Sequence, residues 1–154
     1  MPSLHTPSSR ETLKKRSQTL RPDTPARWGR FDAPAMLAHV IQSLHVMNGE
    51  VPMPMEKTPW VVRNAPLKHL LIYVLPFPKG LPTSKVLLER ASAEVANGAW
   101  EAELDALAVA LDAIGGRPAD GEWPSHAAFG PMTARQWGVL QYRHLDHHFR
   151  QFGI

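Results

Sequence analysis

The sequence predicts an all-α protein, an up-and-down bundle of four long helices with one or two short extra helices. Apolar residues recur with a period of about 3.6 residues in several segments, and proline or glycine separates those segments. No segment alternates apolar and polar residues as a half-buried strand does. The chain has 154 residues, which suits one domain with one hydrophobic core. Residues 1–8 are expected to be disordered, and residues 9–154 to form this single domain.

The first two helices are predicted from their caps and their apolar periodicity. Ser9 is a candidate N-cap for a helix over residues 10–20, which a proline-rich turn then ends. Asp32 is a candidate N-cap for the second helix, in which apolar residues recur at helical spacing over residues 36–47. Gly49 is expected to end this helix, because glycine readily adopts the left-handed conformation of a C-terminal cap.

The middle of the chain gives weaker signals. Residues 51–66 are rich in proline and are predicted to be irregular. Residues 66–75 fit either a short helix or a strand, because this apolar run has no polar face. Residues 85–96 are expected to form another short helix.

Two long helices complete the predicted bundle. Between residues 100 and 114, large apolar residues follow one another at spacings of 4, 3, 4 and 3, which is the stripe of a bundle helix. The last helix is predicted over residues 134–152. Thr133 and Gln136 have the spacing of a capping box, in which each side chain accepts from the other residue's backbone N–H.

Composition excludes several classes of site. The chain has no cysteine, so it has no disulfide, no thiolate ligand and no cysteine nucleophile. No apolar run approaches the roughly 20 residues that span a membrane, and we see no secretory signal, so a cytoplasmic protein without a membrane partner is expected. Residues 1–30 are basic, but aromatic residues are not interleaved there as nucleic-acid stacking would require, which disfavours a nucleic-acid partner.

Two histidines stand in the apolar face of the predicted last helix. On a helical wheel, His144 and His148 fall on either side of the direction of Trp137, where a plain bundle would carry leucine. Histidines four residues apart on a helix can direct their rings at one metal ion. The alternative is a pair of buried histidines that are hydrogen-bonded to polar groups or water.

Other histidines are candidates for the rest of the site. His39 lies at the edge of the apolar stripe of the second helix and is the best candidate for a third ligand, with a half-exposed edge histidine as the alternative. His126 lies in a loop that could offer a fourth ligand or a substrate contact. His147 lies on the flank of the last helix beside Leu140 and could line the site or replace a ligand. Either His126 or His147 could move protons, since imidazole titrates near neutral pH.

Segments spread over residues 28–153 resemble one known family. The segment at residues 137–153 (WGVLQYRHLDHHFRQFG) resembles the C-terminal motif of a bacterial family of unknown function in the DinB/YfiT-like metalloenzyme superfamily. Residues 28–30 (WGR) and 36–39 (MLAH) resemble its N-terminal half. Residues 78–80 (PKG) and 129–133 (FGPMT) resemble its middle and late loops.

This resemblance implies a DinB-like four-helix bundle whose metal ligands are His39, His144 and His148. It implies zinc or nickel as the ion, with iron or copper as alternatives, because three nitrogen ligands suit each of these metals. Some members of the superfamily are S-transferases or isomerases that use a low-molecular-weight thiol such as bacillithiol, mycothiol or glutathione. Others dimerise, which suggests a homodimer here.

Two functions follow as expectations. The first is a metal-dependent enzyme acting on a small molecule, as a thiol-dependent S-transferase or through a hydrolase-type activity. The second is a non-catalytic metal-binding or interaction module, with a weak nucleic-acid contact through the basic N-terminal segment. An open metal position that binds small thiols would favour the enzyme.

Overall fold

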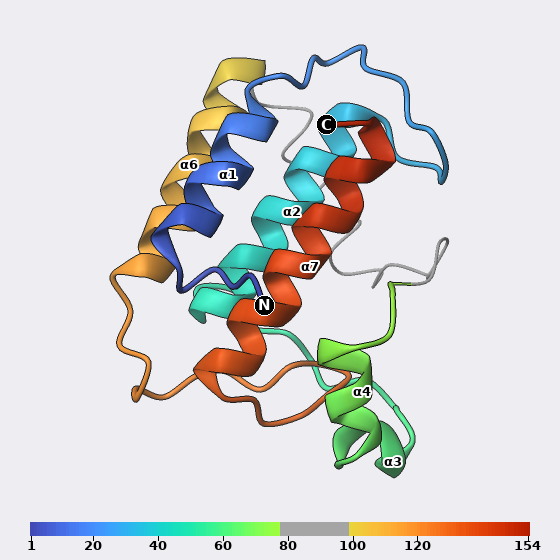
Figure 1. Ribbon diagram of the computed structural model, residues 1–154, viewed down its shortest axis with the longest axis vertical. Coiled ribbons are helices and arrows are strands. Elements are labelled where there is room, and N and C mark those ends of the chain that lie inside the picture. Colours follow the sequence, from blue (N-terminus) through green and yellow to red (C-terminus); the bar gives the residue numbers. More distant parts are fainter. Residues whose placement is uncertain (78–98) are drawn as a thin grey trace.

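The computed structural model describes residues 1–77 and 99–154 (Figure 1). Every regular element in these ranges is an α-helix, and the β-type pairing found there is one isolated bridge between His126 and Gly130. The described helices are α1 (Pro7–Ser17), α2 (Ala33–Asn48), α3 (Trp60–Arg63), α4 (Leu67–Tyr73), α6 (Trp100–Gly115) and α7 (Ala134–Phe152). The predicted all-α class is therefore confirmed.

The four longest described helices lie side by side around one hydrophobic core (Figure 1). Helices α1 and α2 each pack against both α6 and α7. The short helices α3 and α4 contact each other, and α4 also packs against α7. None of the described helices is long and apolar enough to cross a membrane.

Helix α2 has the predicted bounds and caps. The Asp32 side chain accepts a hydrogen bond from the backbone N–H of Ala35 at 2.8 Å, which satisfies one of the free N–H groups of the first turn. Gly49 ends the helix in the left-handed conformation, with φ of 76°. Because α6 covers one side of α2 and α7 another, α2 is buried well beyond its predicted apolar stripe.

Helix α7 also begins and ends as predicted. The Thr133 hydroxyl accepts from the Gln136 backbone N–H at 3.3 Å, and the Gln136 side chain accepts from the Thr133 backbone N–H at 3.0 Å. Trp137, one turn further on, is fully buried in the core. The capping box therefore fixes the start of α7 and with it the face that each later residue presents.

The N-terminus differs from the prediction. Helix α1 begins at Pro7 after the N-cap Thr6, rather than at residue 10 after Ser9, because proline suits a first helical turn, where an N–H would have no partner. Residues 1–8 were expected to be disordered, but Leu4 is fully buried and its N–H donates to the Gly138 carbonyl at 3.0 Å. Gly138 allows this close approach, since a Cβ there would lie 2.4 Å from the Ser3 hydroxyl.

Residues 51–75 contain more helix than the sequence indicated. The four-residue helix α3 lies in the segment predicted to be irregular, and the run at 66–75 is the helix α4 rather than a strand. The guanidinium of Arg143, on α7, donates to the carbonyls of Leu71, Ile72 and Leu75 at the C-terminal end of α4. A cation at this helix end satisfies free carbonyls and favours the helix dipole. The short helix predicted over residues 85–96 lies outside the described residues.

Removal of the α7 cap tests how much this helix start contributes to stability. Thr133→Ala is expected to lower the free energy of unfolding by about 1 kcal/mol, because the Gln136 N–H loses its acceptor. Urea unfolding followed by circular dichroism measures the change. Thr12→Ala, at an exposed site inside α1, is the control and should change stability by less than about 0.5 kcal/mol. Equal losses in the two variants would contradict the capping role.

Candidate metal centre

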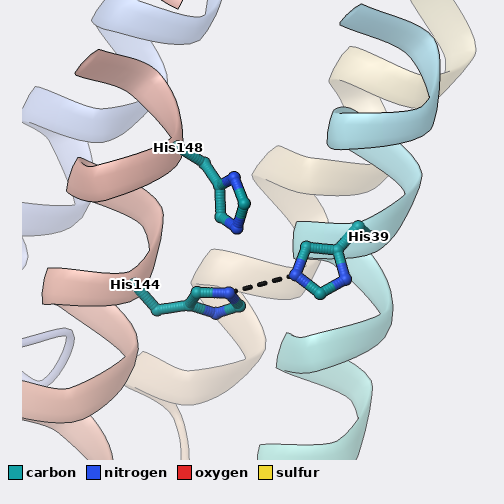
Figure 2. Close-up of side chains that lie close together, drawn as sticks. All are labelled: His39, His144 and His148. Carbon is teal, nitrogen blue, oxygen red and sulfur yellow. Dashed lines mark hydrogen bonds between the residues drawn. The ribbon is translucent and has the colours of Figure 1, made fainter. Parts of the chain in front are cut away.

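Three histidines from two helices converge at the interface of α2 and α7 (Figure 2). His39 comes from α2, and His144 and His148 come from α7. The ring nitrogens that could bind an ion all lie within 4.8 Å of one another. Nε2 of His39 and Nε2 of His144 are 3.1 Å apart. The structure thus brings together the three residues that the sequence analysis selected.

The positions of His144 and His148 follow from the helix that carries them. They are one turn apart, so their side chains leave α7 on the same face. That face also carries Trp137, as the helical wheel predicted, and Trp137 is fully buried in the core. His148 is buried, with 8% of its surface exposed, and His144 is partly exposed. The site is therefore most accessible on the His144 side.

His39 is more buried than its place in the sequence pattern suggested. Only 3% of its surface is exposed, although the wheel put it at the edge of the apolar stripe. The reason is tertiary, since α2 lies against both α6 and α7. The ring of Phe31 stacks on the His39 imidazole, with 5.2 Å between the ring centroids, and covers it on one side.

Burial holds all three imidazoles in their neutral form near neutral pH. Desolvation lowers the pKa of His39 to about 3, with a smaller contribution from His148. Desolvation lowers the pKa of His148 to about 4, partly offset by a hydrogen bond to Gln151. The pKa of His144 lies well below its ordinary value, chiefly through burial. A neutral imidazole has the free lone pair that a metal ligand needs.

Two glutamines on α7 orient the rings of its histidines. Nδ1 of His148 lies 2.9 Å from Oε1 of Gln151, and Nδ1 of His144 lies 3.2 Å from Oε1 of Gln141. An amide oxygen can only accept, so each Nδ1 carries the proton and each Nε2 keeps its lone pair. Metal-binding histidines commonly have such a partner on the other ring nitrogen.

The donor set fits a divalent transition metal ion. Zinc binds imidazole nitrogen at about 2.0–2.1 Å, so two tetrahedral ligands lie about 3.4 Å apart. The His39–His144 nitrogen pair is already near that separation. Within the described residues, the buried Nδ1 of His39 has no hydrogen-bond partner. The other ring nitrogen of His39, Nε2, is the one that contacts His144. The three residues could hold a metal ion.

His126 does not join the cluster. Its Nδ1 accepts from the backbone N–H groups of Ala128 and Phe129 at 3.1 and 3.3 Å, so Nε2 carries the ring proton. Desolvation, with the charge of Lys68, lowers the His126 pKa to about 4. A ring whose lone pair already accepts from two backbone amides is poorly suited to bind a metal or accept a proton. The geometry therefore disfavours His126 as a fourth ligand and as a proton carrier, two of its three predicted roles.

His147 borders the cluster and is not among the three residues whose ring nitrogens lie within 4.8 Å of one another. Its ring centroid lies 5.4 Å from that of His148, 5.8 Å from Phe77 and 6.0 Å from Trp28. Phe77 also lies 6.0 Å from His144 and nearly parallel to it. Aromatic rings thus surround the partly exposed side of the cluster, and His147 remains a candidate for proton transfer there.

Part of the basic N-terminal segment is neutralised within the fold. Lys14 pairs with Glu11 at 3.0 Å and with Asp112 at 2.5 Å. Arg16 pairs with Asp146 at 2.7 Å. These contacts leave less free charge for a nucleic-acid backbone. The Asp146 carboxylate is thus paired with α1 and is not among the residues grouped with the histidines.

No family model, curated protein or solved structure matches this chain. The resemblance to the DinB/YfiT-like superfamily therefore stays a prediction from the sequence motifs. The candidate metal centre rests on the geometry of His39, His144 and His148.

The sequence analysis missed the two glutamines as part of the site. Gln141 lies three residues before His144, and Gln151 lies three residues after His148. Residues three apart on a helix are neighbours, so this symmetric spacing is the signal that could have found them. A buried imidazole has two nitrogens, and the nitrogen that does not face the metal also requires a hydrogen-bond partner. A search for such partners near His144 and His148 would have found both glutamines.

The lowered pKa values predict acid sensitivity of the metal-free protein. The unfolded chain takes up protons on its histidines near pH 6.5, whereas folded His39 and His148 do so only at about 3 and about 4. Stability is therefore fully present above pH 6.5 and falls as the pH drops from 6.5 toward 4. Each such histidine contributes a slope of up to about 1.4 kcal/mol per pH unit.

Denaturant unfolding at several pH values, with a chelator present, measures this slope. A variant with His144→Leu and His148→Leu should have a flatter dependence between pH 6.5 and 4, because it lacks two of the groups. An unchanged slope in that variant would show that the histidines do not couple folding to protonation.

Proposed function

We propose that this protein is a metal-dependent enzyme in which His39, His144 and His148 bind one divalent ion. The observation that supports it is the convergence of three neutral imidazoles, two of them buried and one partly exposed. Glutamine side chains accept from Nδ1 of His144 and of His148. No further His, Asp or Glu joins this group within residues 1–77 and 99–154. Three protein ligands with an open position are typical of catalytic rather than structural sites.

The proposal includes an up-and-down four-helix bundle of the DinB type as the scaffold. The pairwise packing of α1 and α2 against both α6 and α7 supports it. In such bundles, metal sites form in the core from side chains on facing helices. The facing helices here are α2 and α7.

When bound, a divalent ion held by three neutral ligands keeps its full charge, so it lowers the pKa of water or a thiol and polarises an electrophile. The chain's own residues position that ion and limit access to it. His39 and His148 are buried, whereas His144 is partly exposed beside Phe77. Substrate would approach from that side, where the His147 ring could accept or deliver a proton.

In the proposed reaction the sulfur of a low-molecular-weight thiol forms a bond to a small-molecule electrophile, the thiol proton passes to a base such as the His147 ring, and the electrophile's leaving group departs with its electron pair. Hydrolysis is the variant in which water attacks instead of the thiol. The thiol must come from outside the chain, because the sequence contains no cysteine. The aromatic rings of Phe31, Phe77 and Trp28 around the histidines favour an apolar electrophile.

Metal content tests the proposal directly. Elemental mass spectrometry of the untagged protein should find about one equivalent of metal in the wild type. His144→Ala and His39→Ala should each lose most of it, because two imidazoles hold an ion far less tightly than three. His45→Ala is the matched control on α2, since His45 pairs with Glu50 away from the cluster.

A wild type without metal, even after reconstitution with zinc and nickel, would overturn the proposed function. Metal that survives His144→Ala and His39→Ala would place the ion elsewhere. Metal lost from His147→Ala would make His147 a ligand rather than a neighbour.

The open position predicts thiol binding. The cobalt-substituted protein should change its visible absorption when a small thiol such as glutathione is added, because sulfur enters the coordination sphere. The His45→Ala protein should respond in the same way. No spectral change with any thiol would favour the hydrolytic variant of the proposal.

A further inference from the structure

One amide side chain links a metal ligand to the loop before α2. The Gln151 Nε2 donates to the Trp28 carbonyl at 2.6 Å, while Oε1 of the same amide lies 2.9 Å from Nδ1 of His148. The backbone also joins there, since the Arg27 N–H donates to the Gln151 carbonyl at 2.7 Å. Gln151 is buried, with 4% of its surface exposed.

The direction of these bonds follows from the Trp28 carbonyl. A backbone carbonyl can only accept, so the amide nitrogen of Gln151 must face it. The amide oxygen then faces His148 and accepts from Nδ1–H. His148 is thereby left with its lone pair on Nε2, the nitrogen free to bind an ion with His39 and His144.

The loop is shaped to fit this amide. Gly29 has φ of +85°, and a Cβ built on it would lie 2.3 Å from Nε2 of Gln151. A side chain at residue 29 would therefore displace the amide from both of its partners. The same loop carries Phe31, whose ring covers His39 and lies 5.8 Å from His148. The Gln151 side chain therefore contacts both the loop at residues 27–31 and His148.

We propose that Gln151 is a positioning residue with two separable tasks. Its oxygen holds His148 in the Nδ1–H tautomer with Nε2 toward the cluster, and its nitrogen docks the loop at residues 27–31 over the site. The consequence for metal affinity rests on the proposed metal centre, whereas the tautomer and the docking do not. Metal binding and loop docking then favour each other, because both need the same amide orientation.

Two substitutions separate the tasks. Gln151→Glu keeps an oxygen that can accept from His148 but has no N–H for the Trp28 carbonyl. Gln151→Leu removes both bonds. In the metal-free protein at neutral pH, histidine nitrogen NMR should show the Nδ1–H tautomer of His148 in the wild type and Gln151→Glu. It should show a mixture of tautomers in Gln151→Leu.

Loop docking has its own measurement. Hydrogen exchange of peptides spanning residues 27–31, read by mass spectrometry, should accelerate at least tenfold in both Gln151→Glu and Gln151→Leu. Zinc affinity, from competition with a chelator, should fall about 10- to 100-fold in Gln151→Leu. Gln136→Leu is the matched control on α7, because the Thr133 hydroxyl still accepts from the backbone N–H of residue 136 and Gln136 is not among the residues of the histidine cluster.

Gly29 gives an independent test. Gly29→Ala should accelerate exchange of the loop and weaken zinc binding much as Gln151→Leu does, because the new Cβ displaces the amide. Gly49→Ala controls for left-handed backbone strain, since Gly49 has φ of +76° but no contact closer than 3.7 Å to a Cβ. In a Gln151→Leu background, Gly29→Ala should add no more than the effect of left-handed strain measured with Gly49→Ala, as expected for residues that act through one contact.

The outcomes distinguish this inference from the proposed function. Unchanged tautomer and loop exchange in Gln151→Leu would overturn the positioning role, whether or not the wild type binds zinc. A wild type that binds no zinc, with the tautomer and exchange results as expected, would overturn the proposed function and leave Gln151 as the residue that orients His148.

Discussion

The imidazoles of His144 and His148 lie in the apolar face of α7, and the hydrogen-bonding needs of their ring nitrogens explain which polar side chains lie next to them. A buried polar group without a hydrogen-bond partner is destabilising by about 1–3 kcal/mol, so partners for the nitrogens of His144 and His148 stabilise the fold. Glutamines one turn away accept from the outer nitrogens of His144 and His148. The inner nitrogens face His39, which α2 can supply only because it lies directly against α7. The placement of α2 therefore follows from polar as well as apolar contacts.

The choice of amides rather than carboxylates has an electrostatic consequence. A carboxylate partner would place a negative charge in the core beside the histidines and would reduce the effective charge of a bound cation. Gln141 and Gln151 satisfy the rings while remaining neutral, and so does the third imidazole, His39. In a site this buried, Coulomb interactions are weakly screened, so the full charge of the ion would act on whatever occupies the open position.

Helix α7 also organises the irregular parts of the chain. Gly138 leaves room for the N-terminal segment to pack against α7. Arg143 donates to carbonyls at the C-terminal end of α4. Gln151 donates to the Trp28 carbonyl in the loop at residues 27–31. Two of these segments carry aromatic rings to the histidines, Phe77 after α4 and Phe31 before α2. The surroundings of the site are therefore assembled by contacts to one helix, whose start is fixed by the capping box at Thr133.

Interactions between residues close in sequence were enough to predict several helix bounds and the positions of two site histidines. The caps at Asp32 and Thr133 gave the bounds of α2 and α7, and helical periodicity placed His144 and His148 on one buried face, because both depend on neighbours a turn away. Tertiary structure alone decided the burial of His39, which depends on the helices that flank α2, and the order of the N-terminal segment, which depends on a distant glycine. The hydrogen bond between Gln151 and Trp28 could not be predicted from the sequence either, because a contact between residues far apart in the chain produces no periodic pattern.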